Sequence, residues 1–164
     1  MDRSVARSVA HYSHVRRRDR RGVPIVEHLA RVVAAVPAEA QPLAWLHDVL
    51  EHSPTTTSEL CSQGLTPVEL AALELLTRSP GESYELYILR IAYARGAAGR
   101  LARVVKLADL DDHIARPWVT GDPPYAWARR HIAVGCARAA YSSSRPSAFA
   151  RATASEREDA SSLR

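Results

Sequence analysis

The stretch from Pro42 to His52 constrains the fold more than any other part of the chain. It is apolar except for four ionisable residues, which are His47, Asp48, Glu51 and His52. On a helix with about 100° between successive residues, these four side chains share one arc of about 140°. The pattern therefore predicts a buried helix that is polar on one side only. Burying four ionisable groups is costly unless they bind something, and we expect a metal ion.

Two distant residues complete the predicted metal site, with His28 before the stretch and Asp109 after it. The expected ligands are two imidazoles and two carboxylates, namely His28, His47, Asp48 and Asp109. This mixed nitrogen and oxygen set suits Mn²⁺, Fe²⁺, Co²⁺, Zn²⁺ or Mg²⁺ better than a soft metal. Such an ion lowers the pKa of bound water and polarises a phosphoryl oxygen, as hydrolysis of a phosphate ester or a pyrophosphate requires.

Three other polar residues near these ligands, Glu51, Asp112 and His113, also have expected roles. Glu51, one turn after His47, is placed to accept a proton from the bound water. Asp112 and His113 share a helix face with Asp109, where they would orient the ligands or contact a substrate. Alternatively, Asp112 is a solvated acid. We expect His11 and His14 on a surface face and assign no function to them or to His131.

Helical patterns dominate the sequence, and no segment alternates convincingly between apolar and polar residues. The predicted fold class is therefore all-α, a single helical bundle with a buried metal site. Capping boxes at Thr56 with Glu59 and at Thr66 with Glu69 predict two short helices. The other expected helices cover about residues 3–17, 24–36, 39 or 42–52, 84–95 with Gly96 as the stop, 98–115, and 122–141 with Asp122 as the N-cap.

The length of 164 residues fits one domain, which we place over residues 1–141. Residues 142–164 contain seven serines and few large apolar groups, so we expect a disordered tail. Cys61 and Cys136 are far apart and belong to no CxxC motif, which argues against disulfides and thiolate zinc sites. Without a signal peptide or a long apolar run, we expect a cytoplasmic protein that does not contact membranes. The oligomeric state stays open.

The net charge of +4 is unevenly distributed, because residues 1–31 contain eight arginines and only three acidic residues. Five of these arginines form a cluster, made up of Arg16, Arg17, Arg18, Arg20 and Arg21. The cluster could bind phosphate or nucleic acid, or could simply be solvated. A nucleic-acid partner is the weaker reading, because no aromatic residues are interleaved with these arginines.

The order His28, then His47-Asp48, then Asp109 resembles the HD-domain superfamily of metal-dependent phosphohydrolases, which is named after the doublet. The match is closest to the hydrolase domain of stringent-response alarmone enzymes and to their small stand-alone relatives. It covers roughly residues 5–132. The matching segments are Arg17-Arg18-Asp19 with Gly22 and Pro24, Leu46 to Glu51, Thr55 to Leu60, Leu76 to Arg78, Gly81 to Tyr84 with Tyr87, and Val105 to Asp109 with the only lysine, Lys106.

This resemblance implies that the four ligands bind a single Mn²⁺ and that Arg17 lies near a nucleotide. The reaction it implies is removal of the 3′-pyrophosphate from guanosine tetra- or pentaphosphate. Glu51 and His52 stand where the family has a Glu-Asp pair that helps to activate water, so they are the expected catalytic residues. The expected substrate contacts are Arg17, Tyr84, Asp112 and His113.

The chain departs from the family pattern at three positions. His52 replaces a carboxylate, His113 replaces an asparagine, and Leu29 replaces a proline. The leading hypothesis is a metal-dependent phosphohydrolase acting on a phosphorylated nucleotide, with guanosine 3′,5′-bis(diphosphate) as the first candidate. The alternatives are a hydrolase of another nucleotide, or a weakly catalytic module that senses metal and nucleotide.

Overall fold

The computed structural model describes residues 1–19, 21–116 and 124–144, with side chains up to residue 138. Within these ranges the chain is mostly helical, and its one β interaction is an isolated bridge between Arg18 and Pro24. The predicted all-α class is therefore confirmed for the described residues. The helices are α1 (Arg3–His14), α2 (Ile25–Ala34), the 3-10 helix η1 (Ala38–Ala40), α3 (Gln41–Leu46), α4 (Val49–His52), α5 (Thr57–Ser62), α6 (Pro67–Leu76), α7 (Tyr84–Tyr93), α8 (Gly96–Ala115) and α9 (Tyr125–Ser144).

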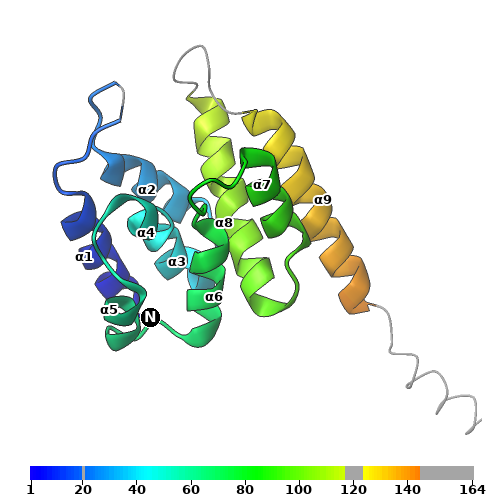
Figure 1. Ribbon diagram of the computed structural model, residues 1–164, viewed down its shortest axis with the longest axis horizontal. Coiled ribbons are helices and arrows are strands. Elements are labelled where there is room, and N and C mark those ends of the chain that lie inside the picture. The colour runs from blue at the N-terminus through cyan, green and yellow to red at the C-terminus, as the bar shows by residue number, and fades with distance from the viewer. Residues whose placement is uncertain (20, 117–123, 145–164) are drawn as a thin grey trace, which may run out of the picture.

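Helices α3 and α8 organise the packing. Helix α3 contacts α1, α2, α6 and α8, and α8 also contacts α2, α6, α7 and α9. In Figure 1 the helices α1 to α4 form one side of the molecule and α7 to α9 the other. A single apolar core connects the two sides through fully buried side chains, among them Leu29, Leu43, Leu46, Leu73, Ile88, Ile91, Leu110 and Ile132. This core supports the polar residues that lie where α2, α3 and α8 meet.

Several helix ends follow the sequence closely. Both predicted capping boxes are confirmed, because the Thr56 and Thr66 side chains accept the N3 backbone N–H groups while Glu59 and Glu69 bond back. Gly64 ends α5 with a φ of 92°, a conformation that glycine adopts without steric cost.

None of the helices in the described ranges has both the length and the apolar character needed to cross a bilayer.

Other helix boundaries differ from the prediction. Helix α1 ends at His14, three residues early, and Gly96 begins α8 instead of ending the preceding helix. Helix α9 runs from Tyr125 to Ser144, so 142–144 are helical although we expected the tail to begin there. The predicted N-cap at Asp122 and the rest of the tail, 145–164, lie outside the described residues.

The predicted continuous helix up to His52 is wrong, because it is divided at His47 and Asp48. Asp48 has φ −99° and ψ −6°, close to the bridge region and away from regular helical values. These dihedral angles interrupt the helical hydrogen-bond ladder between α3 and α4. The four side chains still line one pocket, but they differ in depth, since Glu51 and His52 are exposed while His47 is buried.

Helix α9 approaches α7 very closely at Gly135. A Cβ atom at this position would lie 2.2 Å from the backbone oxygen of Ala92, far inside van der Waals contact. Only glycine therefore permits this separation of the two helices. The contact holds α9, and with it Tyr125 at its N-terminal end, beside α7 and α8.

Candidate metal centre

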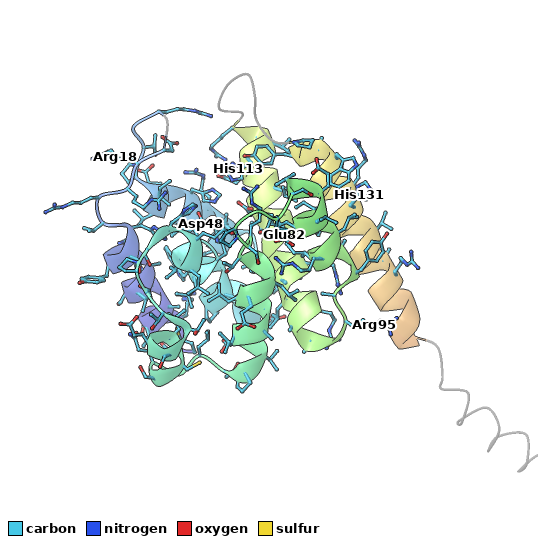
Figure 2. The ribbon with its side chains drawn as sticks, in the orientation of Figure 1. Arg18, Asp48, Glu82, Arg95, His113 and His131 are labelled. Carbon is cyan, nitrogen blue, oxygen red and sulfur yellow. The ribbon has the colours of Figure 1, made fainter. Side chains whose placement is uncertain are left out.

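Three parts of the fold bring the candidate ligands together. His28 lies on α2, His47 and Asp48 form the turn between α3 and α4, and Asp109 and His113 lie on the last two turns of α8. In Figure 2, His113 lies towards one end of α8 and Arg95 at the other, with Asp48 on the neighbouring side of the molecule. Residues more than 60 positions apart thus meet only because α2, α3 and α8 pack against one another.

Asp109 is the centre of the cluster. Its Oδ2 accepts a hydrogen bond from Lys106 Nζ at 2.7 Å. Its Oδ1 lies 3.2 Å from His28 Nε2, 3.2 Å from His113 Nε2 and 3.7 Å from His47 Nε2. Burial raises the pKa of Asp109, but the Lys106 charge and the surrounding imidazoles outweigh it and hold the pKa well below its ordinary value. Asp109 is therefore an anion that presents one oxygen to three histidines.

The outer nitrogens of two histidines show which tautomer each ring adopts. His47 Nδ1 lies 2.8 Å from the carbonyl oxygen of Ala44, which can only accept, so Nδ1 carries the proton. His28 Nδ1 lies 2.8 Å from Asp112 Oδ2, a carboxylate that also accepts. In the neutral rings both Nε2 atoms therefore present lone pairs to the cluster. Both are buried and have no hydrogen-bond partner among the described residues.

This arrangement fits a divalent cation. Donors about 2.1 Å from a shared ion lie about 3.0 Å apart at octahedral angles and about 3.4 Å apart at tetrahedral angles. The pairs His28–Asp109 and His47–Asp48 are separated by 3.2 and 3.4 Å, within this range. Backbone and carboxylate groups already fix the outer nitrogens of both imidazoles, as is usual for metal-binding histidines.

The electrostatics of the cluster also favour a positive charge between the ligands. Burial lowers the pKa of His28, but Asp109 and Asp112 outweigh it and raise the pKa to about 10. Burial likewise lowers the pKa of His47, and the charges of Asp48 and Asp109 outweigh it and raise the pKa. The carboxylates thus stabilise a cationic charge beside these nitrogens, which either a proton or a metal ion supplies.

Asp112 orients His28 from the side away from Asp109. Besides His28 Nδ1, its carboxylate accepts hydrogen bonds from Arg31 at 2.7 and 3.0 Å and from Arg116 at 2.6 Å. Its side chain is only 9% exposed, which excludes the reading as a solvated acid. Both oxygens are in use and place Asp112 to orient His28, a candidate ligand, while its expected contact with a substrate stays a prediction.

Glu51 and His52, the predicted catalytic pair, lie at the rim and not among the buried ligands. Glu51 Oε1 accepts the backbone N–H of Arg78 at 2.6 Å, which fixes one carboxylate oxygen. His52 accepts a hydrogen bond through its backbone oxygen from Arg17 Nη1 at 2.8 Å. This contact ties the loop between α1 and α2 to the end of α4 and leaves the exposed His52 imidazole free to face the opening.

A pocket of about 690 Å³ opens above the cluster. Its size falls in the range typical of small-molecule sites. All ten residues that the sequence singled out line it: Arg17, His28, His47, Asp48, Glu51, His52, Tyr84, Asp109, Asp112 and His113. The structure thus brings the whole predicted set to one place, while their separate roles stay predictions.

The pocket rim is rich in arginine. Six arginines line it: Arg17, Arg18 and Arg21 from the Arg16–Arg21 cluster, and Arg31, Arg78 and Arg116 from elsewhere in the chain. Arg16 does not line the pocket, and residue 20 lies outside the described ranges. The Tyr84 hydroxyl is buried at the pocket wall without a hydrogen-bond partner among the described residues. Burial raises the pKa of Tyr84, so its hydroxyl remains a donor at neutral pH. Six acidic residues line the same pocket, so its seven basic side chains give it only a small excess of positive charge. An anionic group of a ligand is expected to lie beside the arginines.

Sequence reasoning missed the roles of several residues. Lys106 was noted only as part of a motif, although it lies three residues before Asp109 on the same helix face. Arg31 follows His28 by three residues and could have been found in the same way.

The surface placement of His11 is confirmed, whereas that of His14 is wrong, because His14 is 1% exposed. His131 has a local partner, since its ring lies against Trp127 and its Nδ1 contacts the Trp127 carbonyl.

Comparison with known proteins adds no assignment. No protein-family model matches the chain, and no curated protein matches it with significant similarity.

Proposed function

We propose that this protein is a metal-dependent phosphohydrolase of the HD type that acts on a phosphorylated nucleotide. The observation that carries the proposal is the pair of buried Nε2 atoms of His28 and His47, whose lone pairs converge with Asp48 and Asp109 beneath an arginine-rich pocket. The ligands are His28, His47, Asp48 and Asp109. Mn²⁺ is the first candidate by resemblance, and Fe²⁺, Co²⁺, Zn²⁺ and Mg²⁺ also suit the donor set.

The residues around the pocket have complementary tasks in such a reaction. A bound divalent cation would lower the pKa of water and polarise a phosphoryl oxygen. Glu51 is the general base, because one of its oxygens is held by Arg78 N–H and the other remains to take the proton of the attacking water. Lys106 keeps Asp109 ionised and oriented, and Asp112 keeps the His28 proton on Nδ1.

The arginines support a phosphorylated substrate. The N–H groups of one guanidinium bind two phosphate oxygens at once, and six arginines line this pocket beside a neutral Tyr84 donor, of which Arg31 and Arg116 already donate to Asp112. Guanosine 3′,5′-bis(diphosphate), with a pyrophosphate on each side of the ribose, is the first candidate substrate. His52 stands where the resembling family has a carboxylate, and this observation favours a different phosphorylated nucleotide as the second candidate. The expected compartment is the cytoplasm, and nucleic acids and membranes are not expected partners.

The test is a release assay for phosphate and pyrophosphate with Mn²⁺ present. The panel of substrates contains guanosine 3′,5′-bis(diphosphate) (ppGpp), the corresponding pentaphosphate (pppGpp), nucleoside monophosphates and NADPH. The control variants are Asp48→Ala and Glu51→Gln. Pyrophosphate released from ppGpp by the wild type and lost in Asp48→Ala would support the alarmone reaction. We expect Glu51→Gln to lower kcat about 10²- to 10⁴-fold while leaving metal affinity unchanged.

Other results would change the assignment in defined ways. Release from another nucleotide keeps the hydrolase and changes its substrate. Nucleotide binding without product from any member of the panel would contradict the hydrolase and favour a sensor module.

A further inference from the structure

We propose that His113 is an additional protein ligand of the cation in the metal centre, which then has three imidazoles and two carboxylates. The inference rests on the metal site of the proposed function and deepens it. It departs from the expectation that His113 contacts the substrate. It also adds a donor to the four ligands that the resemblance implies.

The distances place His113 within the ligand cluster. His113 Nε2 lies 3.2 Å from Asp109 Oδ1, the same distance that separates His28 Nε2 from this oxygen. Donor atoms of His28, Asp109 and His113 all lie within 4.8 Å of one another, and so do those of His28, His47 and Asp48. The two groups share His28, and Asp109 Oδ1 also lies 3.7 Å from His47 Nε2, so His113 adjoins the other candidate ligands through His28 and Asp109.

A hydrogen bond from His113 to Asp109 satisfies these two groups, but it leaves the Nε2 lone pair of a neutral His28 facing the same carboxylate oxygen. Asp109 Oδ1 lies 3.2 Å from the Nε2 atoms of both His28 and His113, and the His47 Nε2 atom lies farther away, at 3.7 Å. Two of these, on His28 and His47, carry lone pairs of their own when the rings are neutral, because their protons lie on Nδ1. A cation held by His28, Asp109 and His113 would satisfy the carboxylate oxygen and both nitrogens together.

The His113 ring is also held in place from outside the cluster. It stacks on Tyr125 with the ring centroids 4.7 Å apart and an angle of 12° between the planes. The centroid of the His28 ring lies 5.0 Å from that of His113, with an angle of 40° between the planes. His113 follows Asp109 by one helical turn, so both side chains extend from the same face of α8. A ring fixed in this way loses little entropy on binding a metal.

A third imidazole has a consequence for metal choice. Imidazole nitrogen favours Zn²⁺, Co²⁺ and Fe²⁺, whereas Mn²⁺ and Mg²⁺ prefer oxygen ligands. Replacing His113 by asparagine, the residue expected from the resemblance, should therefore weaken Co²⁺ binding more than Mn²⁺ binding.

The experiment measures metal affinity without substrate. Dissociation constants for Co²⁺ and Mn²⁺ are obtained by competition with a chelating dye for the wild type, His113→Asn and His113→Gln, and the visible spectrum of bound Co²⁺ is recorded. His131→Asn is the matched control, because it removes a partly buried histidine whose ring lies against Trp127 on α9. Thermal melting checks that each variant is folded.

We expect both His113 variants to lower Co²⁺ affinity about tenfold or more, to lower Mn²⁺ affinity by less than about threefold, and to change the Co²⁺ spectrum. The His131 control should resemble the wild type. Unchanged affinities and an unchanged spectrum in folded His113 variants would overturn the inference. If Asp48→Ala also retained full metal affinity, the metal site of the proposed function would itself be wrong, so the two failures are distinguishable.

Discussion

Replacing Asp112 by asparagine tests whether the support behind His28 controls metal binding. The substitution keeps the size of the side chain but removes the charge that meets His28, Arg31 and Arg116. An asparagine amide that turns its NH₂ group towards His28 Nδ1 would require a lone pair there. The ring proton would then move to Nε2, the atom that faces the metal centre.

The expected size of this effect follows from the contacts. Loss of a carboxylate that orients a metal-binding histidine typically costs about 10- to 100-fold in metal affinity, or about 1.4–2.7 kcal/mol. The His28 and Arg31 contacts are charge-assisted hydrogen bonds to a carboxylate that is only 9% exposed, which places the expected loss in the upper half of that range. Arg31 and Arg116 are partly exposed, so water can solvate them and the domain should remain folded.

The assay is titration calorimetry with Mn²⁺ on the wild type, Asp112→Asn and Asp111→Asn. Asp111 is the matched control, because it is the adjacent residue, is half exposed and pairs with Arg129 away from the cluster. We expect Asp111→Asn to bind Mn²⁺ like the wild type. Equal affinities for all three proteins would refute the reasoning that Asp112 sets the His28 tautomer.

Three further predictions concern the pocket, the pH dependence and the packing. Arg17→Ala should raise KM for the nucleotide about tenfold or more through loss of a charged phosphate contact, whereas Arg16→Ala, outside the pocket, should not; equal KM values in steady-state kinetics would remove Arg17 from the site. Burial lowers the pKa of His14 to about 4 in the folded protein. Between pH 6.5 and 4 the His14 side chain is therefore protonated in the unfolded chain but not in the folded one, so the free energy of unfolding falls as the pH drops through this range. Between pH 6.5 and 5, the free energy of unfolding measured with urea should fall by about 1 kcal/mol less for His14→Gln than for the wild type, with solvent screening included. Identical pH profiles of the two proteins would contradict this. Gly135→Ala should lower the free energy of unfolding by about 1–3 kcal/mol, because its Cβ would meet the Ala92 backbone oxygen at 2.2 Å, and an unchanged melting curve would show that α9 can move away from α7.

The fold class could be predicted because it depends on local patterns. Helical periodicity needs only the order of apolar residues, and a capping box such as Thr66 with Glu69 is complete within four residues. The division between α3 and α4 could not be predicted in the same way, since every residue from Gln41 to His52 is compatible with one continuous helix. What separates the two possibilities is the backbone conformation of Asp48.

The candidate site shows the same boundary between local and non-local information. The residue types of His28, His47, Asp48 and Asp109, in that order, were sufficient to name a possible ligand set. Helical spacing placed His113 on the same helix face as Asp109. Spacing alone cannot tell whether the His113 side chain contacts a substrate or binds the metal ion.

The amino-acid sequence by itself determined an all-α domain and the chemical character of its polar interior, because periodicity, capping and residue type are local properties. Only the tertiary structure decided which polar groups are buried in the candidate metal centre and which lie at the rim. It paired Asp112 with His28 across 84 positions and turned three imidazoles towards one oxygen of Asp109. Those contacts depend on how α2, α3 and α8 pack, and the direction of a side chain across such an interface is a property of the assembled core.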